Sequence, residues 1–390
     1  MRIGVDFTAA ARQGGGIGRL TRNIIGALAG LDRENLYRLF VAAGRGRDEE
    51  WKDGSLGAAF QTSDHPNFKL KAVPLSDHAL AVAWHRLRLP LFVELFTGPI
   101  DLFHSPDFTL PPVLHARKLV TVHDLSFLRV PECFPDGLRR YLETAVPRAV
   151  HRADHVIADS HNTRRDLAEL LGTSDDKITV IHSGVEPRFR PMSGKSDQAT
   201  LSIVRRKYDL PERFIFSVST VQPRKNYARL VEAFGMLSTQ LSVLDWSLVI
   251  AGGKGWLYGE IFEHVRALNL EGQVRFLGFA DDADLPALYN LSSLFAFPSL
   301  YEGFGLPPLE AMACGVPVVC SNASSLPEVV GDAALTVDPL DVSGLAEAMR
   351  SAIEDESLRT SLVKRGLRRA AAFTWPKAAQ ELLSVYSSMA

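Results

Sequence analysis

The sequence predicts an α/β protein built from two Rossmann-like domains that face each other across a central cleft. Short apolar runs rich in Val, Ile and Phe alternate with amphipathic stretches, and this series occurs twice along the chain. Near-continuous apolar strands separated by helices are typical of parallel sheets that are covered on both faces. The 390 residues also exceed the size at which one core stops growing, which is ~250–300 residues.

Each apolar run is expected to form one strand. The expected strands of the first series lie at residues 2–7, 37–43, 68–74, 101–105, 118–124, 155–160 and 177–184. Those of the second series lie at residues 213–220, 246–253, 273–279, 294–299, 316–321 and 333–338. The amphipathic stretches between them, for example 226–237, are expected to form the covering helices.

The boundary between the two series of expected strands lies at residues 185–202, "VEPRFRPMSGKSDQATLS". This segment combines Pro, Gly, Ser and charged residues without a clear period, which is typical of an interdomain linker. We expect a first domain over 1–190, a second over 191–373, and a helix over about 201–208. Ligands of open α/β sheets bind outside the carboxyl ends of the strands, so the loops there are the candidates for a site.

Composition excludes several classes of function. Hydrophobic residues make up 46% of the chain and charged residues 23%, with 43 basic against 45 acidic side chains, as in an ordinary globular protein. The chain as a whole is not basic, so its overall charge does not indicate nucleic acid as a partner. The start, "MRIGVDFTAA", is expected to be a strand and not a signal peptide, and no run reaches the ~18–20 apolar residues of a membrane span. The three cysteines contain no CxxC pair, which favours reduced thiols in a cytoplasmic protein.

A glycine-rich loop follows the first expected strand. Residues 12–28, "RQGGGIGRLTRNIIGAL", place Gly15 and Gly16 before a helix whose N-terminal N–H groups suit a phosphate. A dinucleotide fingerprint that starts at Gly14 would need glycine where Arg19 stands, so that match fails. A tight turn that binds no ligand is the other interpretation.

Two polar residues end the strand "VTVHDLSFL". His123 and Asp124 lie at the carboxyl end of this strand, where a substrate can bind. Either residue, Asp124 especially, could instead cap the segment that follows. The residues alone leave both interpretations open.

The stretch "SVSTVQPRKNYARLVEAF" places two cations just after a strand. Arg224 and Lys225 are expected in the first turn of a helix, where the helix dipole prefers carboxylates. That placement becomes favourable if the two side chains bind a diphosphate. The Arg guanidinium can donate two parallel hydrogen bonds to a phosphate, and the Lys ammonium group supplies a compact positive charge. The alternative is a pair of solvated surface charges.

The stretch "YEGFGLPPLEAMACGVPVV" places two carboxylates among apolar residues. Glu302 is expected near the end of a strand and Glu310 inside the next helix, with Gly303 and Gly305 freeing the backbone between them. Carboxylates accept hydrogen bonds from vicinal hydroxyl groups, so two of them beside a phosphate-binding helix start suit a sugar nucleotide. The alternative is that neither glutamate binds a ligand, and that one caps a helix while the other lies on the surface.

Two further features have competing interpretations. Asp282 and Asp284 could bind a divalent ion, but acidic residues that begin a helix are favoured there. Residues 84–96, "WHRLRLPLFVELF", could dock on an anionic membrane, although Pro90 interrupts them and packing on their own domain explains them equally well.

The segment from Glu302 to Glu310, "EGFGLPPLE", resembles the E-x7-E motif of retaining GT-B glycosyltransferases of family four. The glycine-rich loop, the His123–Asp124 pair and "QPRKN" at 222–226 follow in the order and at about the spacing of that family. The resemblance covers nearly the whole chain and is strongest over 215–340. It implies the GT-B fold, with a last helix at 374–390 that returns to complete the first domain.

The resemblance implies a role for each matching charged residue. Glu302 would hold hydroxyl groups of the donor sugar, and Glu310 would hold the ribose hydroxyls of the nucleotide. Lys225 would contact the diphosphate together with Arg224. Many family members carry an arginine five positions before the lysine, where this chain has Thr220, so Arg224 is expected to supply that charge from the neighbouring position.

The remaining roles fall on backbone groups and two rings. Main-chain N–H groups that line the sugar or phosphates are expected at Gly15, Gly16, Phe304, Gly305 and Leu306. His123 would contact the donor sugar from the first domain. The base would lie near "VRFLGF", residues 274–279, which include Phe276.

The resemblance implies a retaining, metal-independent transferase without a cofactor, because the two cations can supply the charge a metal would bring. The start of the chain is most like bacterial mannosyltransferases of polysaccharide and O-antigen assembly, so GDP-mannose is the expected donor. The expected acceptor is a glycan or a lipid-linked glycan, with peripheral membrane association in the second case. The alternatives are a UDP-glucose or UDP-N-acetylglucosamine donor and a nucleotide-sugar-binding protein without activity.

Overall fold

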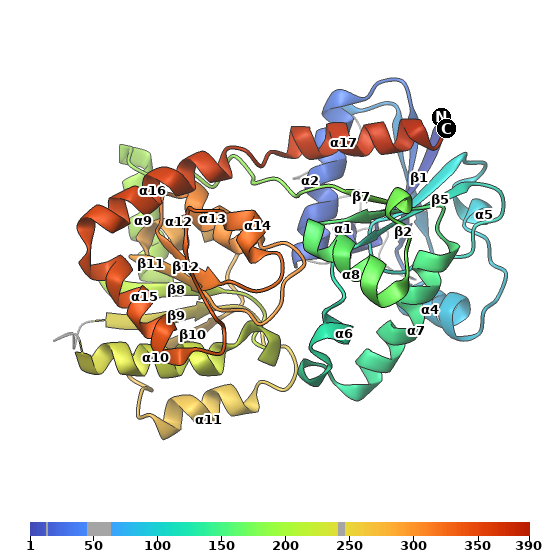
Figure 1. Cartoon of the computed structure of the whole chain (residues 1–390). Coiled ribbons are helices and arrows are strands. Elements are labelled where there is room, and N and C mark those ends of the chain that lie inside the picture. Colours follow the sequence, from blue (N-terminus) through green and yellow to red (C-terminus); the bar gives the residue numbers. More distant parts are fainter. Residues whose placement is uncertain (13–14, 45–63, 241–245) are drawn as a thin grey trace. The chain divides into compact units, whose positions relative to one another are not determined.

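The computed structural model describes residues 1–12, 15–44, 64–240 and 246–390 (Figure 1). Contacts between Cα atoms divide the chain into two compact units. Unit 1 comprises Met1–Leu125, Arg140–Gly184 and Thr374–Ala390, and unit 2 comprises Ser126–Arg139 and Val185–Phe373. The sequence places the boundary at 190 and assigns no part of the first half to the second domain. The predicted cleft concerns the relative placement of the units and stays a prediction.

Unit 1 is built on a parallel sheet, which has seven strands in the described part of the chain, in the order β3-β2-β1-β4-β5-β6-β7. The strands are β1 (Arg2–Asp6), β2 (Leu36–Ala42), β3 (Phe68–Val73), β4 (Leu102–Ser105), β5 (Arg117–Val122), β6 (His155–Ala158) and β7 (Ile178–Val180). The helices are α1 (Thr8–Arg12), α2 (Gly16–Leu31), α4 (Asp77–Ala81), the π-helix η2 (Val82–Arg86), α5 (Glu94–Thr97), α7 (Asp136–Arg152), which begins in unit 2, α8 (His161–Leu171), the 3₁₀ turn η4 (Asp175–Lys177) and α17 (Trp375–Ser388).

Unit 2 is built on a second parallel sheet, with six strands among the described residues in the order β10-β9-β8-β11-β12-β13. The strands are β8 (Arg213–Val218), β9 (Trp246–Ala251), β10 (Val274–Gly278), β11 (Leu294–Phe297), β12 (Val318–Ser321) and β13 (Leu335–Val337). The helices and 3₁₀ turns are α6 (Ser126–Arg129), η3 (Pro131–Cys133), α9 (Lys195–Lys207), η5 (Pro223–Lys225), α10 (Tyr227–Gln240), α11 (Gly259–Ala267), α12 (Leu285–Leu291), α13 (Leu306–Ala313), α14 (Leu326–Val330), α15 (Val342–Glu354) and α16 (Glu356–Ala370).

Both faces of the second sheet are covered at its centre, which explains why its central strands are mainly apolar. Phe214 and Phe216 of β8 pack into one buried cluster, whereas Ile215 between them packs into another. Successive side chains of a strand point to opposite faces, so each face has its own core.

The C-terminal helix belongs to unit 1. Thr374 caps α17 by accepting a hydrogen bond from the Lys377 N–H. Leu382 and Tyr386 are fully buried in the unit 1 core, and α17 packs against α2 (Figure 1). The apolar side chains of this helix therefore have their partners within the described part of unit 1.

The expected helix at about 201–208 begins earlier than predicted. Helix α9 starts at Lys195, because Asp197 accepts hydrogen bonds from the Ser193 and Gly194 N–H groups and pairs with Arg190 at 2.8 Å. A carboxylate in the first turn stabilises a helix start. The polar residues that resemble a linker are thus partly a helix N-terminus.

Candidate active site

Strand order places the candidate site of unit 2. The order reverses between β8 and β11, which are hydrogen-bonded neighbours although β9 and β10 lie between them in the chain. The loop after β8 runs over 219–226 and the loop after β11 over 298–305. Crevices at such reversal points, outside the carboxyl ends of the strands, are where open α/β sheets bind ligands.

Three charged side chains meet at this reversal point. Glu302 Oε1 lies 2.5 Å from Lys225 Nζ, and Glu302 Oε2 lies 3.2 Å from Arg224 Nη1. Arg224 Nη1 also donates to the Tyr301 carbonyl at 2.6 Å, and Lys225 Nζ lies 5.3 Å from the centre of the Phe297 ring. One carboxylate thus holds the guanidinium and the ammonium group side by side.

The cluster of these three residues is buried and carries excess positive charge. Glu302 is 8% exposed, and two cations against one carboxylate leave one net positive charge. Burial alone would raise the pKa of the Glu302 carboxyl, but Lys225 and Arg224 hold it below its ordinary value. An ionised carboxylate beside two cations suits a ligand with hydroxyl groups next to a diphosphate.

The two cations lie in a 3₁₀ turn, which corrects the prediction of a first helical turn. Asn226, at φ 61°, separates η5 from α10. Its amide donates to the Pro298 carbonyl at 3.0 Å and to the Pro339 carbonyl at 2.7 Å. Asn tolerates the left-handed conformation better than most residues, so η5 can end at Asn226 and α10 can begin at Tyr227.

Glu310 lies inside α13 and is 2% exposed. Its Oε2 accepts a hydrogen bond from the Tyr289 hydroxyl at 2.9 Å. A buried carboxylate needs such donors, and this contact fixes the direction in which Glu310 points. Tyr289 has no signal in the sequence, since nothing in the pattern of α12 distinguishes a tyrosine that binds a carboxylate from a tyrosine that only fills the core.

The loop between the two glutamates is tightly held. Ser325 Oγ donates to the carbonyls of Glu302 and Phe304, at 2.9 and 2.6 Å. The Phe304 ring packs on Phe373 in the core, so the ring does not face a ligand. Gly305 has φ +126°, a conformation that favours glycine. It leads into Leu306, the first residue of α13.

Phe276 does not present a free ring. It lies on β10 and packs on Phe262 of α11, with ring centres 4.5 Å apart. Any contact with a base would therefore involve the edge of this aromatic pair or the backbone of the strand.

Gly15 and Gly16 open α2 in unit 1. A Cβ atom added to either residue would meet no described atom within 4 Å. Packing against the described atoms therefore does not require glycine at these positions, and the approach of a ligand to this backbone stays a prediction. Gly14 of the same loop lies outside the described residues.

His123 lies directly after β5, as predicted, but both of its ring nitrogens are engaged within unit 1. Nδ1 lies 2.8 Å from Asp159 Oδ2, and Nε2 lies 3.0 Å from the Pro106 carbonyl. Burial lowers the pKa of His123, but Asp159 first and Asp107 after it outweigh that effect and raise the pKa to about 9. The ring is therefore a cation at neutral pH, and its stabilising effect on the fold is lost as the pH rises through about 9.

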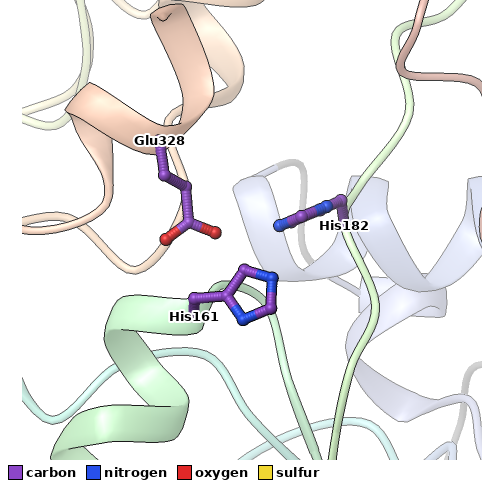
Figure 2. Close-up of side chains that lie close together, drawn as sticks. All are labelled: His161, His182 and Glu328. Carbon is purple, nitrogen blue, oxygen red and sulfur yellow. The ribbon is translucent and has the colours of Figure 1, made fainter.

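Two further histidines stand together in unit 1. His161 begins α8 and His182 follows β7, with ring centres 5.7 Å apart and a T-shaped geometry (Figure 2). Glu328, also labelled in Figure 2, lies on α14 of unit 2. Among the described residues of either unit taken alone, no three metal-ligating side chains come together.

The two features with competing interpretations are partly resolved. Asp284 lies at the start of α12, and its carboxylate binds Lys207 Nζ at 2.6 Å and the Tyr208 hydroxyl at 2.9 Å. That cation and hydroxyl are its partners in the structure. In the 84–96 segment, Trp84 and Phe96 pack on Phe40. Leu87, Leu89 and Leu95 of the same segment are exposed.

The family model described as "Glycosyl transferases group 1" matches residues 203–369, and that described as "Glycosyltransferase Family 4" matches residues 14–189. The O-antigen chain mannosyltransferase B of Escherichia coli is 35% identical over 286 residues, which cover 73% of this chain and 74% of that protein. The chain belongs to glycosyltransferase family four. The match to the serotype-specific mannosyltransferase WbdA of Escherichia coli, 36% identical, covers 58% of this chain and 28% of that longer protein.

Solved structures confirm the predicted GT-B fold class. The structure of Anabaena Alr3699/HepE in complex with UDP and glucose matches with a TM-score of 0.73 and 21% identity, over 99% of each chain. At this identity the likeness concerns the fold. The family membership makes this protein a glycosyltransferase.

Proposed function

We propose that this glycosyltransferase moves mannose from GDP-mannose to a glycan or lipid-linked glycan acceptor, with retention of the anomeric configuration and without a metal ion. The observation that carries the proposal is the buried cluster of Arg224, Lys225 and Glu302 at the reversal point of the unit 2 sheet. The relatives named as O-antigen mannosyltransferases support the sugar.

The cluster suits the charge that develops when a glycosyl phosphate bond breaks. The bond between the anomeric carbon and the phosphate oxygen breaks, and the acceptor oxygen bonds to that carbon on the same face. The acceptor proton goes to the leaving phosphate. Lys225 and Arg224 stabilise the charge on the departing diphosphate, which is a preorganised electrostatic effect. Glu302 accepts hydrogen bonds from sugar hydroxyls and positions the two cations.

A calorimetric binding panel tests the donor and the metal independence together. We expect GDP and GDP-mannose to bind more tightly than UDP, ADP and their sugars, with the same affinity after EDTA is added. Glu310→Gln is expected to weaken GDP binding by roughly tenfold or more, since a hydrogen bond to a charged group contributes ~1.5–3 kcal/mol.

Glu356→Gln is the matched control, because Glu356 lies on the exposed side of α16 in the same unit. A preference for UDP would support the alternative, a UDP-glucose or UDP-N-acetylglucosamine donor, and retain the mechanism. Loss of binding in EDTA would overturn the metal independence. Nucleotide binding without transfer to any acceptor would favour the non-catalytic alternative.

Peripheral membrane binding forms a second part of the proposal. Leu87, Leu89 and Leu95 are 61%, 42% and 69% exposed, and the exposed cations Arg86 and Arg88 stand among them. Exposed leucines beside cations suit an anionic bilayer surface. Among the described residues, no helix has the length and apolar character to cross a bilayer.

Sedimentation with vesicles of phosphatidylglycerol and phosphatidylcholine at low salt tests this surface. We expect the wild type to sediment with the vesicles and the double variant Arg86→Gln/Arg88→Gln to stay largely in the supernatant. Equal sedimentation of the two proteins would contradict the role of these cations. Lys195→Gln, an exposed lysine of unit 2, is the control for the loss of charge alone.

A further inference from the structure

One asparagine side chain connects three loops of unit 2. Asn226 directly follows the 3₁₀ turn that carries Arg224 and Lys225, and it is 3% exposed. Its Nδ2 donates to the Pro298 carbonyl at 3.0 Å and to the Pro339 carbonyl at 2.7 Å. Pro298 is the first residue after β11, and Pro339 is the second residue after β13. A single amide group therefore holds together the loops that follow β8, β11 and β13.

The hydrogen-bonding groups of the Asn226 amide are all engaged. A side-chain NH₂ group has two N–H donors, and the two proline carbonyls accept both. Its Oδ1 accepts a hydrogen bond from Arg229 Nη1 at 3.0 Å. The opposite orientation of the amide would turn its oxygen toward two carbonyl oxygens and its NH₂ group toward a guanidinium. The observed orientation therefore satisfies every group, and the reversed one would satisfy none.

The position needs both the backbone and the side chain of asparagine. Asn226 has φ 61°, in the left-handed region that Gly, Asn and Asp adopt most readily. Glycine would keep this backbone but would lack the amide. Aspartate would keep the shape but would turn carboxylate oxygens toward the two carbonyl oxygens. Of these three residue types, only asparagine supplies two donors.

Two further contacts run between the same loops and lead to the charged cluster. The Leu300 N–H donates to the Arg224 carbonyl at 2.9 Å, and Arg224 Nη1 donates to the Tyr301 carbonyl at 2.6 Å. The next residue is Glu302, whose Oε1 lies 2.5 Å from Lys225 Nζ although the two residues are 77 positions apart in the chain. Because the opposite charges come from different loops, their separation depends on what holds those loops together.

We propose that Asn226 is a positioning residue of the transfer reaction, which sets the separation of Lys225 and Glu302 by fixing the loop after β8 against the loop after β11. It acts through these side chains, since its own amide is fully engaged within the protein. A misplacement of reacting groups by ~1 Å can cost about 10²-fold in rate. The inference rests on the proposed function for the reaction that is measured, but the geometry can be tested without any donor.

Asn226→Gly tests the proposal, because it removes the amide and keeps the left-handed backbone. We expect its turnover in sugar transfer to fall by roughly 10- to 100-fold. Asn269→Gly is the matched control, since Asn269 has φ 54° in the same unit and is exposed. Asn67→Ala controls for the loss of a buried amide, because Asn67 Nδ2 donates to the Asp32 and Asn35 carbonyls in unit 1. Both controls are expected to keep the turnover of the wild type.

A double-mutant cycle separates positioning from a general loss of stability. If Asn226 acts through Lys225, Asn226→Gly should lower turnover by a much smaller factor in the Lys225→Met background than in the wild type. A structural effect alone would lower turnover by the same factor in both backgrounds, and that result would overturn the inference. Turnover of Asn226→Gly equal to that of Asn269→Gly would overturn it as well.

A crystal structure of Asn226→Gly without nucleotide supplies a measurement that needs no donor. We expect Lys225 Nζ to move away from Glu302 Oε1, and an unchanged contact would overturn the inference. If the variant loses this contact but the wild type transfers no sugar from GDP-mannose, the proposed function alone fails. Should Asn226→Gly not fold, Arg229→Leu removes only the donor to Oδ1 and is expected to lower turnover by a smaller factor. Wild-type turnover of that variant would then contradict the inference.

Discussion

Replacing Lys225 by methionine is expected to lower the rate of mannosyl transfer by about 10²–10³-fold, the effect of removing one preorganised electrostatic contact. Methionine keeps the length and apolar stem of lysine but removes the charge that meets Glu302 at 2.5 Å. Glu302 keeps Arg224 as a partner at 3.2 Å, so the carboxylate is not left alone in a buried position. The loss should therefore appear in turnover more than in folding.

The measurement is initial-rate transfer from radiolabelled GDP-mannose, with thermal unfolding recorded for each variant. Lys195→Met is the matched control, since Lys195 is exposed at the start of α9 in the same unit. Lys225→Arg should recover part of the activity, because it returns a cation with different geometry. Turnover of Lys225→Met equal to that of Lys195→Met would show that the diphosphate is stabilised elsewhere.

The strands of both sheets could be predicted from sequence because parallel strands are buried on both faces. Each of the expected runs, from 2–7 to 333–338, overlaps an observed strand. Phe214, Ile215 and Phe216 show the reason: consecutive residues serve opposite cores, so all must be apolar. The start of α9 was less predictable, because its first turn is stabilised by a side chain, Asp197, that a linker could equally contain.

The site was predictable only in part. A polar residue after an apolar strand is predicted to lie at the carboxyl edge of a sheet. That signal locates His123 directly, and it locates the loops that carry Lys225 and Glu302. It would also have located Asp6 and Asp159, which end or follow strands in the same way. Sequence does not reveal that His123 is held by Asp159, 36 positions away, since that pairing depends on β5 and β6 being neighbours.

Replacing Gly252 by alanine is expected to destabilise unit 2 by about 2–6 kcal/mol, the sum of ~1–3 for an unfavourable backbone conformation and ~1–3 for overpacking. Gly252 follows β9 with φ +143°, and an added Cβ would lie 1.9 Å from the Ser219 carbonyl oxygen. That oxygen belongs to the backbone after β8 and cannot swing aside like a side chain. The loop that leads from Ser219 to Lys225 would have to shift, so transfer activity should fall as well.

Gly253 provides a control one residue away. A Cβ added there would meet nothing within 4 Å among the described atoms, so Gly253→Ala should be neutral or stabilise by ~0.4–1 kcal/mol. Because the two units can unfold separately, hydrogen exchange of the β8 and β9 amides is the appropriate readout. Faster exchange in both strands is expected for Gly252→Ala alone. Equal protection in the two variants would mean that the close approach of Gly252 to Ser219 does not hold these loops together.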